Sequence, residues 1–338
     1  MVRIVRVASV LAIVGCAVSP PPVSVTKSAN VALAVEIVVD EAPRVTRTDQ
    51  VIVVAIDGAR WQEIFSKDSI MPTLRRFMTT DGISVGAPGY GEMRASGPNY
   101  VSLPGYTELF TGRTSACRSN DCAPIDQRTI VDEVIDAGGE AAVISSWETI
   151  DRAAAREPAR VVLSTGRRRV SHGDVFDPKT FDEGARSGPG CGVGEYRPDA
   201  HTIRLALDYL SHHTPRFAFV GLGDTDEHAH RDNRVGYMDA LRTADAFLAQ
   251  LETRVSEHAA IFVTADHGRA ANFKDHGATP EAARVWLVAR GAGIDARGPL
   301  EASPVRLADV APTIRCLLGL PRVIAPNGGE SISQICSY

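Results

Sequence analysis

Acidic and histidine side chains follow three apolar stretches of this chain, at residues 51–56, 217–222 and 260–264. Short runs of this kind are typical of strands that are buried on both faces of a parallel sheet. The carboxyl ends of parallel strands lie at one edge of the sheet, where such proteins bind ligands. Aspartate and histidine are common ligands of zinc and other divalent cations. The sequence therefore predicts a metal site at this edge, built from some of Asp57, Asp224, Asp226, His228, His230, Asp266, His267 and His276.

Each of these motifs is a weak indicator when it is taken alone. An Asp-Gly pair after a strand, such as Asp57-Gly58, is usually a turn. An Asp-x-x-x-His pair can be the solvated start of a helix. Asp266-His267-Gly268 is more informative, because packing does not readily explain a strand-end carboxylate beside an imidazole. The prediction of a metal site rests on the occurrence of all three motifs at successive strand ends.

Strands and helices alternate along the rest of the chain. Further strands are predicted at 141–145 and 285–289, and helices at 72–78, 129–137, 199–212, 235–255 and 307–318. This alternation predicts an α/β fold with a mainly parallel sheet that is covered on both faces. Residues 167–198 are rich in glycine, proline and charge, and we expect long loops there that could cover the site.

The first residues have the layout of an export signal rather than of a folded element. A positive start at Arg3 and Arg6 precedes a short apolar run, far shorter than the roughly 20 residues of a membrane span. The segment that ends in Cys16 resembles a bacterial lipoprotein cleavage box, in which Cys16 would carry a lipid anchor; ordinary cleavage a few residues later is the alternative. We expect a periplasmic or membrane-anchored protein of a bacterial envelope. Its expected parts are a signal at 1–19, a tether at 20–48 and a folded domain at 49–338.

The composition argues against one class of function and suggests disulfides. The 338-residue chain carries a formal net charge of -5 and no long basic run, so nucleic-acid binding has no electrostatic support. An exported protein meets an oxidising environment, in which Cys117 could pair with Cys122 and Cys316 with Cys336. Cys191 would be left over. Free thiols without a role are the alternative for each pair.

The motifs together resemble those of the alkaline phosphatase superfamily, over residues 51–320. The segment 53–58 resembles the opening strand of that family with its metal-binding aspartate. Ser102 stands two residues before a proline and opens a segment that ends in Thr-Gly, as the nucleophile of the family does. The segment 264–268 and His276 match the closing metal motifs. The resemblance implies a three-layer α/β/α sandwich with a mainly parallel central sheet, in the nucleotide pyrophosphatase/phosphodiesterase-like metalloenzyme branch.

The resemblance implies two divalent metal ions. We expect zinc because the ligand set contains several imidazoles, and manganese is the alternative. The pair Asp224 and His228 has the same spacing as Asp226 and His230, and we prefer the second pair because Asp-x-x-Ala-His is the form found in similar family members. The first ion is expected on Asp57, Asp266, His267 and Ser102, and the second on Asp226, His230 and His276.

The chemistry of the family implies an exported two-metal hydrolase of phosphoric esters. Metal coordination lowers the pKa of a serine hydroxyl, so that Ser102 could attack phosphorus and form a phosphoseryl intermediate. Two divalent ions outweigh three carboxylates by about one charge, which favours an anionic phosphoryl group. Asn99 and Arg113 are close to Ser102 in sequence and could contact that group, or they could be surface loop residues. The expected substrate is a phosphorylated small molecule or a component of the envelope.

Three departures from family patterns bear on the substrate. Tyr106 stands where sulfatases have an arginine, and Gly58 where they tend to have a second aspartate. Gly105 stands where phosphodiesterases usually have an asparagine, so the choice between monoester and diester stays open. The alternatives are a sulfatase-like or phosphoryl-transferase member of the same superfamily, and a non-catalytic envelope lipoprotein with this fold. The presence of every expected ligand speaks against the last alternative.

Overall fold

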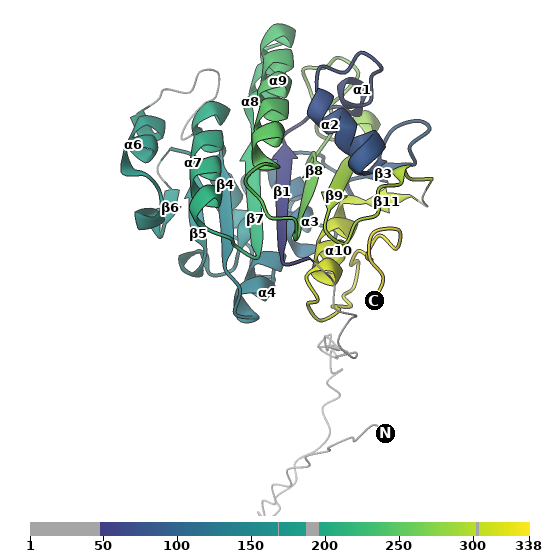
Figure 1. The fold of residues 1–338 in the computed structure, drawn as a ribbon. Helices are drawn as coiled ribbons and strands as arrows, with labels where there is room; N and C mark the ends of the chain where they lie inside the picture. The colour runs from purple at the N-terminus through teal and green to yellow at the C-terminus, as the bar shows by residue number, and fades with distance from the viewer. Residues whose placement is uncertain (1–47, 168, 187–195, 302–303) are drawn as a thin grey trace, which may run out of the picture. The chain divides into compact units, whose positions relative to one another are not determined.

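A nine-stranded sheet lies at the centre of the computed structural model, which describes residues 48–167, 169–186, 196–301 and 304–338 (Figure 1). The strands are β1 Gln50–Ile56, β2 Gly82–Val85, β3 Met93–Arg94, β4 Ala141–Ser145, β5 Val162–Thr165, β6 Arg169–Ser171, β7 Phe217–Leu222, β8 Ala259–Thr264, β9 Leu287–Gly291, β10 Gly298–Pro299 and β11 Val305–Arg306. The order in the large sheet is β10-β2-β9-β8-β1-β7-β4-β5-β6, and β3 pairs with β11 separately. The strands from β8 to β5 are parallel to one another, whereas β9 and β6 run antiparallel to their inner neighbours.

The central strand β1 shows why these segments form a buried sheet. Every residue of β1 is buried, and the strand pairs in parallel with β7 on one side and with β8 on the other. Successive side chains of a strand point to opposite faces of the sheet. Val51 and Val53 accordingly belong to one hydrophobic core, and Ile52 and Val54 to the other. A strand that is apolar on both sides is stable when helices cover both faces.

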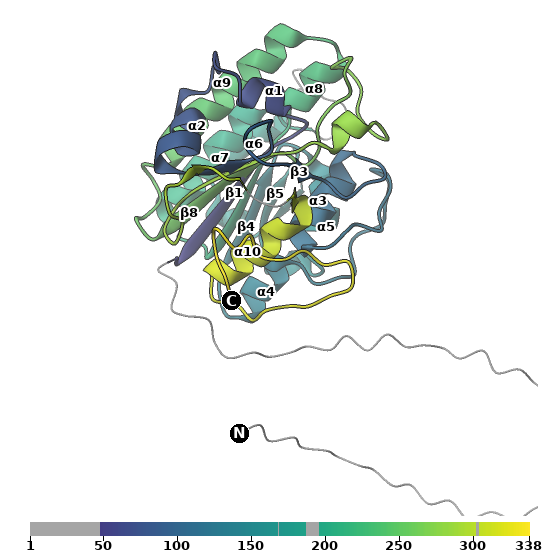
Figure 2. The ribbon, with the colours of Figure 1, turned by 90° about the vertical axis from the view of Figure 1, so that its right-hand side faces the viewer.

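Helices do cover both faces, as Figure 2 shows. Within the described residues they are α1 Trp61–Ile64, α2 Pro72–Arg76, α3 Ser102–Thr111, α4 Ile130–Asp136, α5 Asp151–Ala154, α6 Pro178–Arg186, α7 Asp199–His212, α8 Asp224–His230, α9 Arg234–Leu251 and α10 Val310–Leu317. Residues of α2, α7 and α9 share one core with the sheet, and residues of α3, α4 and α10 share the other. The predicted three-layer α/β/α sandwich is therefore confirmed.

Most predicted elements lie where the sequence placed them. The strands at 141–145 and 217–222 and the helix at 199–212 have the predicted bounds. The strand predicted at 285–289 is β9, which is shifted by two residues and runs antiparallel to β8. The helix α2 ends before the predicted residue and continues as a short π-helix. Local periodicity therefore located the elements, and their ends depend on contacts that lie outside them.

The prediction of long loops at 167–198 is wrong in part. This segment contains β6 and α6, whereas residues 168 and 187–195 lie outside the described residues. The backbone amide of Thr180 donates a hydrogen bond to Asp177 Oδ2 at 2.7 Å, which satisfies one donor at the start of α6. Phe181 packs against the hydrophobic core. A cap and a single apolar anchor thus support a helix in a segment whose composition is that of a loop.

Two disulfides join the predicted cysteine pairs. Cys117 is bonded to Cys122, and Cys316 is bonded to Cys336. The first bond closes a small loop between α3 and α4, and the second ties the C-terminal segment to α10. Both pairings are therefore confirmed. Cys191, the predicted unpaired cysteine, lies outside the described residues.

The predicted signal at 1–19, the lipidation site Cys16 and nearly all of the tether predicted at 20–48 lie outside the described residues. The first described residue, Thr48, is buried, and its Oγ1 donates to the carbonyl of Ala292 at 2.8 Å. Among the described residues, no helix has the length and apolar character that a bilayer crossing needs. Export and lipid anchoring remain predictions.

Replacement of Thr129 by alanine should destabilise the domain, because Thr129 caps α4. Its Oγ1 accepts a hydrogen bond from the amide of Asp132 at 3.2 Å and donates one to the carbonyl of Ala154 at 2.8 Å. We expect a loss of about 1–2 kcal/mol in the free energy of unfolding, measured by urea denaturation. The matched control is Thr243→Ala on the exposed side of α9, where Oγ1 donates to the carbonyl of Asp239. That control should lose less than about 0.5 kcal/mol, and equal losses in the two variants would contradict the capping role.

Candidate metal centre and nucleophile

Three neighbouring strands end at the predicted site. Asp57 follows β1 directly, Asp266 and His267 follow β8, and α8 begins just after β7. Because β1 lies between β7 and β8 in a parallel arrangement, all three ends meet at one edge of the sheet. Asp226 and His230 lie four residues apart on α8 and therefore on one face of that helix. The topology thus gathers the predicted ligands from segments that are far apart in sequence.

Four ligand atoms form a tight cluster at the ends of β1 and β8. The Nε2 atom of His267 lies 3.4 Å from Asp57 Oδ1 and 3.5 Å from Asp266 Oδ2. Ser102 Oγ, on the first residue of α3, lies 3.3 Å from the same Nε2 atom and 3.4 Å from Asp57 Oδ1. None of the four residues is more than 5% exposed. We call these four residues the first cluster.

The geometry of the first cluster fits a tetrahedral metal ion. Ligand atoms at the usual bond length from a tetrahedral zinc ion are separated from one another by roughly 3.3–3.5 Å. The four distances given above lie in this range. Oδ2 of Asp266 is also buried and accepts no hydrogen bond from any described residue. Such an oxygen is costly to bury unless a cation lies beside it, so both the spacing and the unsatisfied oxygen favour a metal ion.

A second cluster, of Asp226, His230 and His276, adjoins the first. The Nε2 atom of His230 lies 3.1 Å from Asp226 Oδ2 and 3.0 Å from His276 Nε2. The other oxygen of Asp226 lies 3.9 Å from His276 Nε2. The ring of His276 stacks on that of His267 with 4.2 Å between their centres, which joins the two clusters. Three protein ligands leave a coordination position free, which is typical of catalytic rather than structural zinc sites.

Burial and mutual repulsion raise the pKa of the carboxyl groups in the first cluster. Burial raises the pKa of Asp266 well above its usual value, and the charge of Asp57 raises it further. Burial likewise raises the pKa of Asp57, with a contribution from the charge of Asp226. Burial opposes the charging of His267, but Asp266 and Asp57 outweigh it and raise the pKa of this imidazole to about 10. Metal-free protein should therefore retain protons in this cluster at neutral pH.

Two members of the second cluster have their pKa lowered instead. Burial opposes the ionisation of Asp226, but its hydrogen bond with His230 and the charge of Arg269 outweigh burial and lower the pKa of this carboxyl group. Burial, followed by the charge of His267, lowers the pKa of His276 to about 3. An ionised carboxylate and a neutral imidazole are the forms that bind a metal ion. These two side chains are thus ready to act as ligands at neutral pH.

The alternative pair Asp224 and His228 lies outside both clusters. Asp224 Oδ1 accepts a hydrogen bond from Tyr196 at 2.7 Å, and its Oδ2 accepts one from the amide of Asp199 at 3.3 Å. His228 Nδ1 lies 3.2 Å from Asn233 Nδ2. Two residues along a helix correspond to a rotation of about 200°, so the two candidate pairs face opposite sides of α8. The structure therefore brings the preferred pair, and not the alternative, to the predicted ligands that follow β1 and β8.

The nucleophile segment depends on a glycine. A Cβ atom at Gly105 would lie 2.4 Å from the carbonyl oxygen of Asp266, so a larger residue would push α3 away from the end of β8. An asparagine at position 105 would therefore clash with the backbone of Asp266 in this arrangement. An asparagine does reach the N terminus of α3 from elsewhere, since the amide of Leu103 donates to Asn120 Oδ1 at 2.9 Å. Asn120 belongs to the small loop closed by the first disulfide.

One cavity of about 480 Å³ borders both clusters. It is lined by Asp57, Ser102, Asn120, Trp147, Tyr196, Gly223, Asp226, Glu227, His230 and Arg231. Sequence reasoning missed the walls formed by Asn120, Trp147 and Tyr196, because these residues come from separate loops and carry no periodicity or family motif. Arg231 and Glu227 form an ion pair of 2.8 Å at the rim, one helical turn apart, and this spacing is the only signal that could have indicated them.

Neither of the two expected substrate contacts lines this cavity. Asn99 Nδ2 donates to the carbonyl of Arg118 at 2.7 Å. Arg113 follows the far end of α3, and a helix of ten residues separates it from Ser102 by about 15 Å. The backbone of Arg113 forms a bridge with Gly328 in the C-terminal segment. Contact of either residue with a substrate therefore stays a prediction, and neither has a role in the proposed mechanism.

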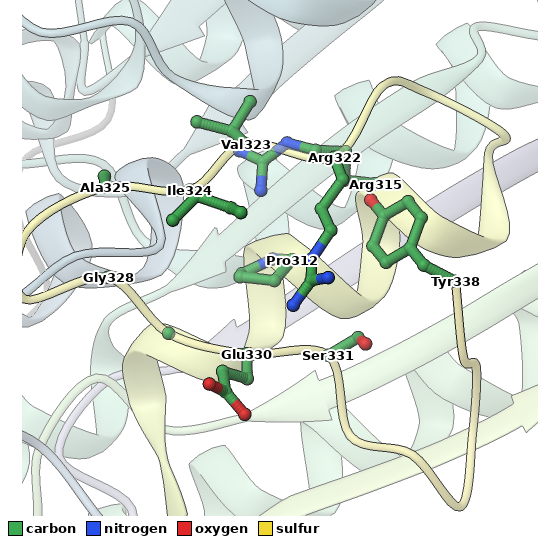
Figure 3. A pocket seen from close by; sticks show the side chains of 11 residues that line it. Pro312, Arg315, Arg322, Val323, Ile324, Ala325, Gly328, Glu330, Ser331 and Tyr338 are labelled. Atoms are coloured by element: carbon green, nitrogen blue, oxygen red, sulfur yellow. The ribbon is translucent and has the colours of Figure 1, made fainter. Parts of the chain in front are cut away.

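A second cavity, of about 90 Å³, lies in the C-terminal segment (Figure 3). Arg315, Arg322 and Tyr338 contribute to its walls. The guanidinium of Arg315 is already engaged, because it donates to both carboxylate oxygens of Glu133 at 2.6 and 3.0 Å. None of the predicted metal ligands lines this cavity. The larger cavity beside Ser102 is therefore the candidate active site.

Each clustered carboxylate has one oxygen that is held by a protein donor. Tyr106 donates to Asp57 Oδ2 at 2.9 Å, and the buried Arg269 donates to Asp226 Oδ1. The backbone amide of Gly58 donates to Asp266 Oδ1 at 3.1 Å. Donors of this kind orient a ligand and leave its other oxygen free for a cation. Neither Tyr106 nor Arg269 was identified from the sequence as a partner of a ligand.

Comparisons with known proteins agree with this fold. Residues 194–322 match the family model described as the Metalloenzyme superfamily. Over 174 residues the chain is 28% identical to a phosphopentomutase of Clostridium perfringens, and the match covers 51% of this chain and 39% of that enzyme. A protein of the alkaline phosphatase superfamily from Vibrio parahaemolyticus gives a TM-score of 0.60 at 16% identity, over 87% of this chain and 72% of the other. A putative sulfatase from Bacteroides thetaiotaomicron gives a TM-score of 0.59 at 13% identity, and the match covers 85% of this chain and 74% of the sulfatase.

These similarities establish an alkaline phosphatase-like fold and confirm the resemblance to that superfamily. They do not single out one branch, because a phosphopentomutase and a putative sulfatase are both among the matches. The match to the curated enzyme spans less than half of that enzyme's length. The expected nucleotide pyrophosphatase-like branch therefore stays a prediction, because a shared fold does not determine the reaction.

Metal binding to the first cluster should strengthen as the pH rises. The pKa values of Asp57, Asp266 and His267 are all raised, so a metal ion has to displace protons that these groups otherwise hold. We expect the affinity for zinc to increase between about pH 6 and pH 9, with net release of protons. Isothermal titration calorimetry in buffers of different ionisation enthalpy measures both quantities. An affinity that is independent of pH, with no proton release, would contradict this account.

Proposed function

We propose that this chain is an exported two-metal hydrolase of phosphoric esters that acts through a phosphoseryl intermediate on Ser102. The observation that carries the proposal is the position of Ser102 Oγ, which lies 3.3 Å from His267 Nε2 and 3.4 Å from Asp57 Oδ1. This hydroxyl stands at a helix N terminus and at the wall of the larger cavity. A serine with only a packing role would not need to face two metal-ligand atoms.

The ligand sets of the two clusters suit zinc, with manganese as the alternative. Carboxylate and imidazole donors together are typical of zinc sites, whereas magnesium and calcium prefer oxygen donors alone. When bound, the two ions would lower the pKa of the serine hydroxyl and offset the charge of the phosphoryl group. The residues that would hold them are Asp57, Ser102, Asp266 and His267 for one ion, and Asp226, His230 and His276 for the other.

The chain's own residues supply the nucleophile and its orientation. Ser102 Oγ would attack phosphorus, forming a serine–phosphorus ester bond as the bond to the leaving oxygen breaks. Water would then hydrolyse the phosphoserine ester and regenerate the hydroxyl. The positive end of the α3 dipole favours an anionic group beside Ser102. Asn120 already binds the amide of Leu103 and so fixes the first turn of the helix.

The charge of the site favours an anionic substrate. Three buried carboxylates would be outweighed by two divalent ions by about one charge. The buried guanidinium of Arg269, which lies against Asp226, adds a further positive charge to those of the two metal ions. Fixed charges act strongly on a substrate in an enclosed site of low dielectric. A net positive cavity is suited to the negative oxygens of a phosphoric ester.

Two positions favour a phosphoric over a sulfuric ester. Tyr106 stands at the helix position where sulfatases carry arginine, and its hydroxyl is committed to Asp57 Oδ2. Gly58 stands in place of a second acidic residue. Its backbone has φ +59°, and a Cβ atom there would lie 2.7 Å from Asp226 Oδ1. An aspartate at position 58 would therefore clash with Asp226 in this arrangement.

We further propose that the chain acts outside the cytoplasm, on a phosphorylated small molecule or an envelope component. The two disulfides support this location, because structural disulfides persist in oxidising compartments. Lipidation of Cys16 would keep the enzyme at a membrane surface. The alternatives within the superfamily, a sulfatase-like or a phosphoryl-transferase reaction, are distinguished by the assay below.

Substitution of Ser102 by alanine should abolish turnover and leave the fold intact. We expect kcat to fall by at least about 10³-fold, because the group that forms the covalent intermediate is removed. The substrates are an aryl phosphate monoester, a bis-aryl phosphodiester, an aryl phosphonate and an aryl sulfate, each tested with zinc-loaded protein. We expect the wild-type protein to hydrolyse one of the phosphorus esters faster than the sulfate. Bound zinc, measured by elemental analysis, should be retained in part through the remaining ligands.

The matched control is Ser84→Ala, which removes a buried hydroxyl on β2 that donates to the carbonyl of Met78. This variant should keep its activity. The proposal fails if Ser102→Ala stays active, or if removal of metal by a chelator leaves wild-type activity unchanged. A clear preference for the aryl sulfate would overturn the assignment to phosphoric esters.

A further inference from the structure

Arg269 is a buried cation beside the second cluster, and no family motif singled it out. We propose that Arg269 is the positioning residue of the second metal site. Its guanidinium connects α8 to the loop that carries His276, and so holds Asp226 and His276 in one arrangement. This inference rests on the proposed function, because it assumes that the second cluster binds a metal ion.

The guanidinium of Arg269 reaches three acceptors from two separate parts of the chain. Nη1 donates to Asp226 Oδ1 on α8. Nε donates to the carbonyl of Phe273 at 2.5 Å, and Nη2 donates to the carbonyl of Lys274 at 2.5 Å. Those two carbonyls closely precede His276 in sequence. Because Arg269 is only 2% exposed, water cannot readily replace any of these bonds.

The loop that ends at His276 has a conformation that needs such support. The amide of Ala270 donates to the carbonyl of Asp275 at 2.8 Å, which closes the loop on itself. Phe273 has φ 72°, a left-handed conformation that costs energy for an aromatic residue and persists where its surroundings enforce it. The bond from Arg269 to the Phe273 carbonyl is one of these constraints. Without the guanidinium, the loop could relax and carry His276 away from Asp226.

The first cluster is held by other donors. Tyr106 binds one oxygen of Asp57, and a backbone amide binds one oxygen of Asp266. Among the described residues, the hydrogen bonds that the Arg269 side chain donates go to Asp226 and to the loop, and none goes to the first cluster. Loss of the guanidinium should therefore impair one metal site and spare the other.

Lysine should not replace this arginine. A guanidinium is a rigid planar fork that offers several donors in fixed directions, whereas an ammonium is a compact point charge on a flexible stem. A lysine at position 269 would keep the charge but could not hold a carboxylate oxygen and two carbonyl oxygens in the same geometry. Arg269→Lys therefore separates the bridging geometry from the charge, and Arg269→Met removes both.

The test compares zinc binding by the full-length wild-type protein, Arg269→Lys, Arg269→Met and the matched control Arg315→Lys. Arg315 is likewise buried and paired with a carboxylate, Glu133, but it lines the C-terminal cavity away from the metal ligands (Figure 3). Elemental analysis after equilibrium dialysis gives the ions bound per chain, and competition with a chelator of known affinity gives the affinity of each site. Far-UV circular dichroism monitors the fold.

We expect the wild-type protein and Arg315→Lys to bind two zinc ions. Both Arg269 variants should keep one ion with unchanged affinity and bind the other about 10–100-fold more weakly. Unchanged binding of both ions by the Arg269 variants would overturn this inference and leave the proposed function intact. An equal loss of affinity at both zinc sites would also overturn the inference, because the effect would then not be specific to the second site. The same loss of zinc affinity in Arg315→Lys would overturn it too, because any buried arginine would then have this effect. Fewer than two ions on the wild-type protein would overturn the two-metal proposal itself.

Discussion

Buried carboxylates that meet at the ends of two adjacent strands set the main electrostatic constraint in this structure. Asp57 and Asp266 are 4% and 0% exposed, and the charge of Asp57 adds to the burial that raises the pKa of Asp266. Burying two carboxylates side by side costs free energy that packing contacts alone do not offset. The arrangement becomes favourable when cations lie among the carboxylates. We therefore interpret this edge of the sheet as a metal centre and the surrounding sandwich as its support.

The support consists of close contacts that leave little freedom to the ligands. Gly58 allows the turn after β1 to lie against Asp226 and Arg269, and Gly105 allows α3 to lie against the end of β8. Tyr106 and Arg269 then fix one oxygen of a carboxylate each. A site held in this way needs little rearrangement when it binds a cation or a charged substrate. Because phosphatases and sulfatases share the fold, it is these local contacts, and not the sandwich, that should select the reaction.

The sequence was a good guide wherever the information is local. β1 could be predicted because its residues are all apolar, and Asp57 and Asp266 could be predicted because they directly follow such runs. The sequence was a poor guide wherever the outcome depends on packing between distant segments. Asn99 was expected at the substrate, whereas Asn120 reaches the nucleophile helix from a disulfide loop that has no motif. The two Asp/His pairs of α8 have the same spacing, so the preference for Asp226 and His230 came from their resemblance to a family form, and the structure agrees with it.

The central claim is that two metal ions lie at this edge of the sheet, within reach of Ser102. Anomalous X-ray diffraction at the zinc absorption edge, from crystals of zinc-loaded protein, tests it most directly. Two anomalous peaks are expected. One should lie among Asp57, Ser102, Asp266 and His267, and the other among Asp226, His230 and His276. A map with no peak at these positions, or with a single peak that leaves either group of side chains without a metal ion, would contradict it.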